Sequence, residues 1–145
     1  MQDQNVRWLQ RFANFKKALA KLAEVFEDRE DDLSDLEQEG MIQRFEYTFE
    51  LAWKTLQDLL RYKGYLDIAG PNPVLEQALK DGYLTDAEGW KAMKKSRELT
   101  SHTYNSETAE EIADSIRFSY YKLLVDLDKR LDAERGGQQT SLIDT

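Results

Sequence analysis

The chain has 145 residues, a net charge of -8 at pH 7, no cysteine and a single histidine. Hydrophobic residues make up 41% of it, an ordinary share for one folded domain with a substantial core. The absence of cysteine excludes disulfides, thiolate nucleophiles and cysteine-bound zinc. The negative charge argues against binding nucleic acid through a broad basic surface.

The negative charge is concentrated in one segment. Residues 24–39 contain nine acidic residues and one arginine, whereas residues 1–23 contain five basic residues and one acidic residue. A solvated turn between two helices is the plainer interpretation of the acidic segment, and contact with a basic partner is the alternative. The acidic segment therefore need not lie near the single histidine.

Membrane insertion and export are not expected. No apolar run approaches the roughly 18 residues of a membrane-spanning helix, and the first residues, MQDQNVRW, lack the apolar core of a signal peptide. We therefore expect a cytoplasmic protein that makes no membrane contact.

Two long helices are predicted first. Six apolar residues recur at spacings of three and four, which is typical of an amphipathic helix: Trp8, Phe12, Phe15, Leu19, Leu22 and Phe26. Ser34 and Glu37 then have the spacing of a capping box, which predicts a second helix running to about Tyr62. Gly64 is the predicted stop signal. The wide apolar face of this second helix predicts a central position in the fold.

Two shorter helices are predicted next. Asn72 as a cap and Pro73 at the first position predict a short helix that ends near Gly82. Thr85 with Glu88 repeats the capping-box spacing and predicts the start of a fourth helix.

One more long helix completes the fold. Ser106 or Thr108 can cap it, and we expect it to end at the glycine pair that begins with Gly136. We expect one domain over residues 1–134 and a disordered tail over residues 135–145. Strand-like alternation is absent, so the sequence predicts an all-α, up-and-down bundle of three long and two short helices. The wide apolar faces also suggest a homodimer.

The stretch RELTSHTY begins at Arg97 and contains the only histidine, His102. We expect the arginine in the last turn of the fourth helix and the histidine in the loop beyond. An imidazole ordinarily titrates near pH 6.5 and can take and give protons, whereas a guanidinium binds phosphate through a planar fork of donors. Together they can cleave RNA without a metal, although one histidine per chain cannot easily serve as both base and acid. The plainer alternative is a loop histidine whose ring nitrogens are hydrogen-bonded within the fold and that has no catalytic role.

Three lysines precede the arginine on the fourth helix. Lys91, Lys94 and Lys95 form a small basic patch that can bind RNA. The alternative is a solvated helix end whose cations complement the helix dipole.

A pair of carboxylates on the second helix offers a different chemistry. Glu46 and Glu50 lie one turn apart and can hold a magnesium ion or act as an acid-base pair. Pairing of Glu50 with Lys54 is the plainer alternative. We predict no metal site and no cofactor for this chain.

Three stretches of the chain resemble a known family. They are Arg44–Gly64, Asn72–Trp90 and Arg97–Asn105. Their order and spacing are similar to those of small HEPN-domain proteins known as nucleotidyltransferase substrate-binding proteins. The resemblance extends over roughly Trp8 to Leu131.

The resemblance implies a dimeric helical bundle that pairs with a minimal nucleotidyltransferase (MNT), often as a toxin-antitoxin module. In such pairs the HEPN protein is a metal-independent endoribonuclease with the motif R-x4-H-x-Y, which corresponds here to Arg97, His102 and Tyr104. The resemblance also implies that the nucleotidyltransferase silences the nuclease by transferring AMP to Tyr104. The alternatives are a non-catalytic subunit that presents substrate to the nucleotidyltransferase, and a plain structural bundle.

One position departs from the family pattern. Glu98 follows the motif arginine, where a small polar residue such as asparagine is common. A carboxylate pointing toward the site would repel phosphate, whereas one pointing into solvent would change little.

Overall fold

The computed structural model describes the backbone of residues 2–27, 29, 31–102 and 105–144, and side chains from residue 3 to residue 137 within those ranges. Within them the chain is helical and contains no strand, which confirms the predicted all-α class. The helices are α1 (Gln2–Phe26), α2 (Asp35–Tyr62), α3 (Pro71–Lys80), α4 (Ala87–Thr100), α5 (Ser106–Ser115), a π-helical turn η1 (Ile116–Tyr120) and α6 (Tyr121–Asp144).

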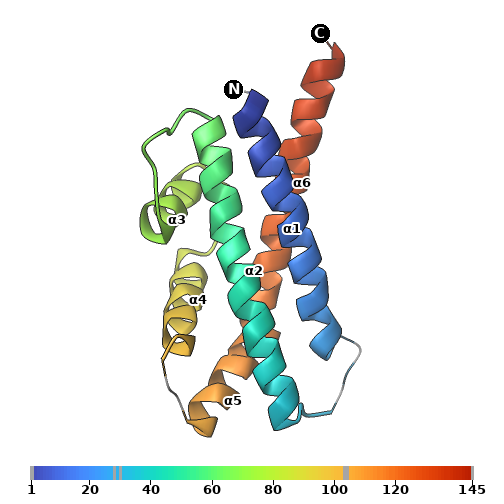
Figure 1. Cartoon of the computed structure of the whole chain (residues 1–145), viewed down its shortest axis with the longest axis vertical. Coiled ribbons are helices and arrows are strands. Elements are labelled where there is room, and N and C mark those ends of the chain that lie inside the picture. The colour runs from blue at the N-terminus through green and yellow to red at the C-terminus, as the bar shows by residue number, and fades with distance from the viewer. Residues whose placement is uncertain (1, 28, 30, 103–104, 145) are drawn as a thin grey trace.

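The long helices form an elongated bundle around α2. Helices α1 and α2 run antiparallel along each other, α6 lies behind them, and α3 and α4 follow one another along the opposite flank of α2 (Figure 1). Because α2 contacts α1, α3, α4 and α5, it is the central helix that its wide apolar face predicted. Among the described residues, every helix is too short or too polar to span a bilayer.

The apolar stripe of α1 forms one wall of the core. All six residues that predicted this helix are buried, and Trp8, Phe12 and Phe15 are completely inaccessible. Complete burial of a large apolar side chain stabilises a fold by about 1.5–3 kcal/mol relative to exposure. The stripe therefore accounts for both the formation of α1 and its attachment to the bundle.

The acidic segment connects α1 with α2 and is held by its single arginine. Arg29 pairs with Asp31 at 3.1 Å and with Glu37, and Arg117 donates a hydrogen bond to the Arg29 carbonyl oxygen at 2.7 Å. The Arg29 guanidinium, with help from Ser34, lowers the pKa of the Glu37 carboxyl to about 2. The described residues of this segment thus form a turn between two helices, as its plainer interpretation predicted.

Both predicted ends of α2 are confirmed. The Ser34 side chain accepts a hydrogen bond from the Glu37 amide at 3.2 Å, and the Glu37 side chain accepts one from the Ser34 amide at 2.9 Å. After Tyr62 the chain turns through Gly64, whose φ of 115° is a conformation that side-chain-bearing residues rarely adopt.

The predicted start of α4 is wrong by one residue. The N-cap is Asp86 and not Thr85, because the Asp86 carboxylate accepts a hydrogen bond from the Gly89 amide at 3.0 Å. Asp86 has a φ of 64°, and a Cβ on Gly89 would lie 2.5 Å from the Asp86 carboxylate. Aspartate tolerates the left-handed conformation and glycine permits the close approach, so this pair replaces the predicted capping box.

The predicted caps of α3 and α5 are also displaced. Helix α3 begins two residues earlier than expected, with Gly70 as N-cap in place of Asn72. The reason is that Pro71 occupies the first helical position, which proline favours. Helix α5 is capped by Asn105, whose side chain accepts a hydrogen bond from the Thr108 amide at 2.8 Å, and not by Ser106 or Thr108.

The last helix differs from expectation in two ways. The run from Ser106 is interrupted by the π-helical turn η1, which its sequence did not predict. It also continues through Gly136 and Gly137 to Asp144, so the predicted end at the glycine pair is wrong. A glycine costs about 1 kcal/mol relative to alanine in a helix but keeps its N–H donor, so two glycines weaken a helix without ending it.

Replacing the confirmed cap should have a measurable cost. Ser34→Ala is expected to lower the free energy of unfolding by about 1 kcal/mol, because it leaves the Glu37 amide without its side-chain acceptor. Thr85→Ala is the matched control, since Thr85 has the same sequence signature but does not cap α4. Urea denaturation followed by circular dichroism measures both variants, and equal losses would contradict the assignment.

Candidate functional site

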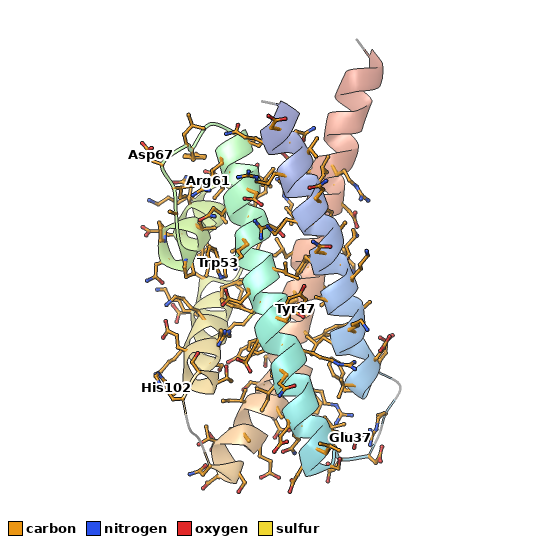
Figure 2. All side chains as sticks on the ribbon, in the orientation of Figure 1. Glu37, Tyr47, Trp53, Arg61, Asp67 and His102 are labelled. Carbon is orange, nitrogen blue, oxygen red and sulfur yellow. The ribbon has the colours of Figure 1, made fainter. Side chains whose placement is uncertain are left out.

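The end of α4 brings the predicted arginine and histidine into the expected order. Arg97 lies in the last turn of α4, which ends at Thr100. His102 follows in the turn, where its amide donates a hydrogen bond to the Leu99 carbonyl oxygen at 3.2 Å, and it is exposed (Figure 2). Tyr104, the predicted AMP acceptor, lies outside the described residues.

The Arg97 side chain points toward α2, where two carboxylates meet it. Its Nη1 lies 3.2 Å from Glu46 Oε2 and its Nε lies 3.4 Å from Glu50 Oε1. The Nη1 group also donates a hydrogen bond to Ser101 Oγ at 2.8 Å. The contact between Nε and Glu50 has ion-pair distance without hydrogen-bond geometry. The side chain is only 22% exposed, so α2 and the end of α4 fix its position together.

These contacts correct the expectation for the two glutamates. Glu50 does not pair with Lys54 among the described side chains; it pairs with Arg97 and accepts a hydrogen bond from Trp53 Nε1 at 3.1 Å. The ammonium of Lys54 instead lies 5.8 Å from the centre of the Trp53 ring. Spacing along α2 correctly placed Glu46 and Glu50 on one face, but it did not indicate that α4 would present a guanidinium to that face.

The local charge around Arg97 is therefore negative. One guanidinium faces two carboxylates. An incoming phosphate would therefore be attracted by the guanidinium and repelled by the two carboxylates that pair with it. The Nη1 and Nε groups of Arg97 already face these carboxylates, and Nη1 also bonds Ser101, so a phosphate would approach a guanidinium that is partly neutralised.

The π-helical turn η1 holds α4 through hydrogen bonds of Tyr120. Tyr120 is buried, and its hydroxyl donates a hydrogen bond to the Ala92 carbonyl oxygen at 3.1 Å. The Ser96 hydroxyl lies 2.7 Å from the same Tyr120 oxygen and can act as its donor. The Tyr120 ring also stacks on Phe45 of α2, with centroids 5.7 Å apart. The sequence did not predict these polar contacts of Tyr120.

Glu98, the residue that departs from the family pattern, pairs with a lysine on its own helix and not with Arg97. Glu98 is 61% exposed and pairs with Lys94, whose ammonium holds the pKa of the Glu98 carboxyl below its usual range. Lys91 and Lys95 are exposed and make no ion pair among the described residues. Glu98 therefore offsets one lysine of the basic patch and does not contact Arg97.

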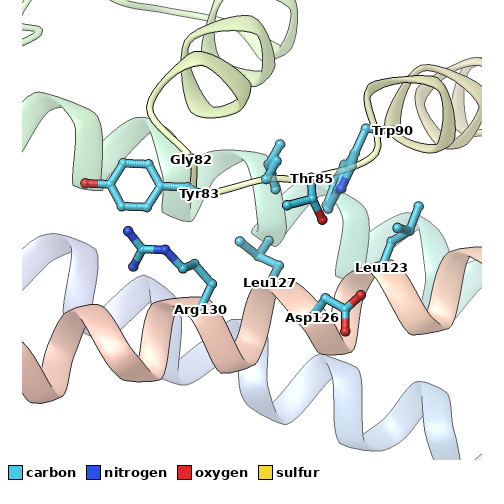
Figure 3. A pocket seen from close by; sticks show the side chains of 9 residues that line it. Gly82, Tyr83, Thr85, Trp90, Leu123, Asp126, Leu127 and Arg130 are labelled. Atoms are coloured by element: carbon cyan, nitrogen blue, oxygen red, sulfur yellow. The ribbon is translucent and has the colours of Figure 1, made fainter.

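A small cavity lies between α6 and the connection that precedes α4 (Figure 3). It has a volume of about 180 Å³, and its lining includes Tyr83, Asp126 and Arg130. The Arg130 guanidinium lies 4.7 Å from the centre of the Tyr83 ring, and burial raises the pKa of the Tyr83 hydroxyl to about 12. None of its lining residues comes from the Arg97 end of α4, so this cavity is separate from the candidate site.

The fold and the site together define an all-helical bundle with an arginine and a histidine at the exposed end of its fourth helix. Residues 10–133 match the family model described as nucleotidyltransferase substrate binding protein like. The chain belongs to this family, which confirms the resemblance noted in the sequence.

Relatives with solved structures have the same fold. A protein from Thermus thermophilus is 42% identical, with a TM-score of 0.71 over 81% of this chain and 98% of that one. A protein from Haemophilus influenzae is 26% identical, with a TM-score of 0.62 over 89% of this chain and 98% of that one. Its structure is described as revealing the fold of a substrate binding domain of a nucleotidyltransferase.

A curated relative from Haemophilus influenzae is described as a probable ribonuclease, HepT. It is 34% identical over 74 residues, which are 48% of this chain and 51% of the relative. The match thus spans about half the length of that relative.

Proposed function

We propose that this chain is a metal-independent endoribonuclease and the toxin of a two-gene HEPN/MNT pair. The observation that carries the proposal is the exposed His102 fixed directly beyond the helix turn that holds Arg97. The similarity to a probable ribonuclease supports the same chemistry.

The two side chains suit a defined reaction. The His102 imidazole takes the proton of an RNA 2′-hydroxyl, whose oxygen then attacks the adjacent phosphorus. The bond from phosphorus to the 5′-oxygen breaks, and that oxygen receives a proton, which leaves a 2′,3′-cyclic phosphate. The Arg97 guanidinium stabilises the charge that develops on the phosphate oxygens.

The proton for the leaving oxygen requires a second group. Each chain has one histidine, so we propose a homodimer in which a second copy of the motif supplies that proton across a two-fold axis. The pairing of Arg97 with Glu46 and Glu50 holds the guanidinium at the end of α4, where it would meet the phosphate.

Control by the partner would act next to the same residues. We propose that a minimal nucleotidyltransferase transfers AMP from ATP to the Tyr104 hydroxyl, with pyrophosphate as the leaving group. Tyr104 is two positions from His102 in the sequence, so an adenylate there would occupy the phosphate site and repel RNA.

Co-expression with the nucleotidyltransferase tests this control. The wild-type chain expressed alone should arrest growth, and the partner should relieve the arrest while adding the mass of one AMP to the peptide that contains Tyr104. Tyr104→Phe should remain toxic beside the partner and gain no mass, because it lacks the acceptor oxygen. Full neutralisation of Tyr104→Phe by AMP transfer would refute the assignment of the acceptor.

A second candidate function is a non-catalytic subunit that presents substrate to the nucleotidyltransferase. Two observations favour it: the carboxylates of Glu46 and Glu50 surround Arg97, and one structural relative is described as a substrate binding domain. In this case wild type and His102→Ala would be equally inert toward tRNA and mRNA.

A further inference from the structure

A groove separates α3 from α4 on the flank of the bundle. It has a volume of about 560 Å³, within the size range of pockets that hold a small organic molecule or a nucleotide. Six of its lining residues carry its chemistry: Leu75, Leu79, Trp90, Lys80, Lys91 and Lys94. None of these was assigned to the catalytic step above.

The wall of the groove is apolar and its rim is cationic. Leu75 and Trp90 are buried and Leu79 is half-buried, so these side chains make the wall of the groove apolar. Three lysines surround it, opposed by the single carboxylate of Glu76.

Two of the rim lysines, Lys80 and Lys91, are exposed, whereas the side chain of Lys94 is 22% exposed and pairs with Glu98. Lys80 lies 3.7 Å from Glu76, but both side chains are about two-thirds exposed, and such a surface pair is weak. Lys91 makes no ion pair with any described residue, and Lys94 pairs only with the exposed Glu98. A ligand for this groove should therefore combine an apolar body with negative charge.

Helix α4 connects the groove with the candidate site. Lys91, Lys94 and Arg97 are spaced three residues apart, so successive side chains are neighbours on the helix surface. With a rise of 1.5 Å per residue, the three span about 9 Å along the axis. Lys94 lines the groove and lies one turn before Arg97, so an anionic chain can follow α4 from one to the other.

We propose that this α3–α4 groove binds a nucleotide of single-stranded RNA close to the cleaved bond. The base packs on Leu75 and Leu79, and Lys91 and Lys94 contact its phosphates. Single-stranded RNA fits because its unpaired bases expose flat apolar faces and its backbone carries one charge per nucleotide. The inference rests on the proposed ribonuclease function and extends it from the reacting phosphate to a neighbouring nucleotide.

Binding of a short single-stranded RNA oligonucleotide tests the groove. His102→Ala serves as the parent, so that the full-length protein does not cleave the probe. In this parent, Lys91→Glu and Leu79→Asp are each expected to weaken binding about tenfold, measured by fluorescence anisotropy. Lys91→Glu should also reduce the slope of log affinity against log salt by about 1.

The control reverses one charge at an exposed lysine of α6, Lys122→Glu. It should leave the affinity within about twofold of the parent, because Lys122 lies outside the groove. Equal weakening by Lys122→Glu and Lys91→Glu would mean that only net charge matters, which would overturn the inference. Circular dichroism checks that each variant is folded.

The outcome is separable from that of the ribonuclease proposal. If wild type cleaves RNA while the groove variants bind it like the parent, the groove is not a subsite and the nuclease stands. If wild type does not cleave RNA while both groove variants lose affinity, the RNA-binding groove stands and the nuclease fails. If the variants keep RNA affinity but lose the nucleotidyltransferase, the groove is a protein interface and the inference is overturned.

Discussion

His102→Ala is expected to lower the rate of RNA cleavage by about two to four orders of magnitude, because it removes the only imidazole available for proton transfer. The measurement is cleavage of labelled tRNA and mRNA by purified protein in EDTA. Activity of the wild type in EDTA and its loss in His102→Ala would together support a metal-independent nuclease. If neither protein cleaves RNA, the substrate-binding alternative is favoured.

The matched control for this experiment is Glu98→Gln. Glu98 directly follows Arg97 in the sequence, but its carboxylate is exposed and pairs with Lys94. We therefore expect cleavage at least within a few-fold of the wild type, because the change removes a charge that does not contact the guanidinium and frees the Lys94 ammonium for RNA. A loss as large as that of His102→Ala would show that the end of α4 is sensitive to any substitution and would contradict a specific role for the histidine.

Phe45→Ala is expected to lower the free energy of unfolding by about 3–5 kcal/mol, because it leaves a cavity in the centre of the bundle. Phe45 is completely inaccessible, and its ring centroid lies 6.2 Å from that of Phe49 and 5.7 Å from that of Tyr120. Tyr120 in turn holds the backbone of α4 through Ala92. Urea denaturation measures the loss.

Tyr47→Ala is the control on the same helix. Tyr47 lies two positions after Phe45 but is 61% exposed, so its replacement should change stability by no more than about 0.5 kcal/mol. Comparable losses in the two variants would contradict the assignment of the inner face of α2.

The sequence determined the helical class and the approximate extent of the first four helices, but not the division of the last predicted helix or its end. The regular spacing from Trp8 to Phe26 predicted α1 and its buried face, and the pairing of Ser34 with Glu37 fixed the start of α2. These features are local: a helix repeats every 3.6 residues and a cap bonds an amide three residues away, so both can be recognised in a short stretch. The same locality placed Arg97 in the last turn of α4 and His102 beyond it.

Only the tertiary structure decided which helices bring their side chains together. The contacts of Arg97 with Glu46 and Glu50 join residues on two helices, and the support of Ser96 by Tyr120 depends on an unforeseen π-helical turn. The α3–α4 groove likewise depends on how two short helices follow one another along α2. Spacing within one helix identifies the face that a residue occupies, but the crossing of helices determines what that face meets.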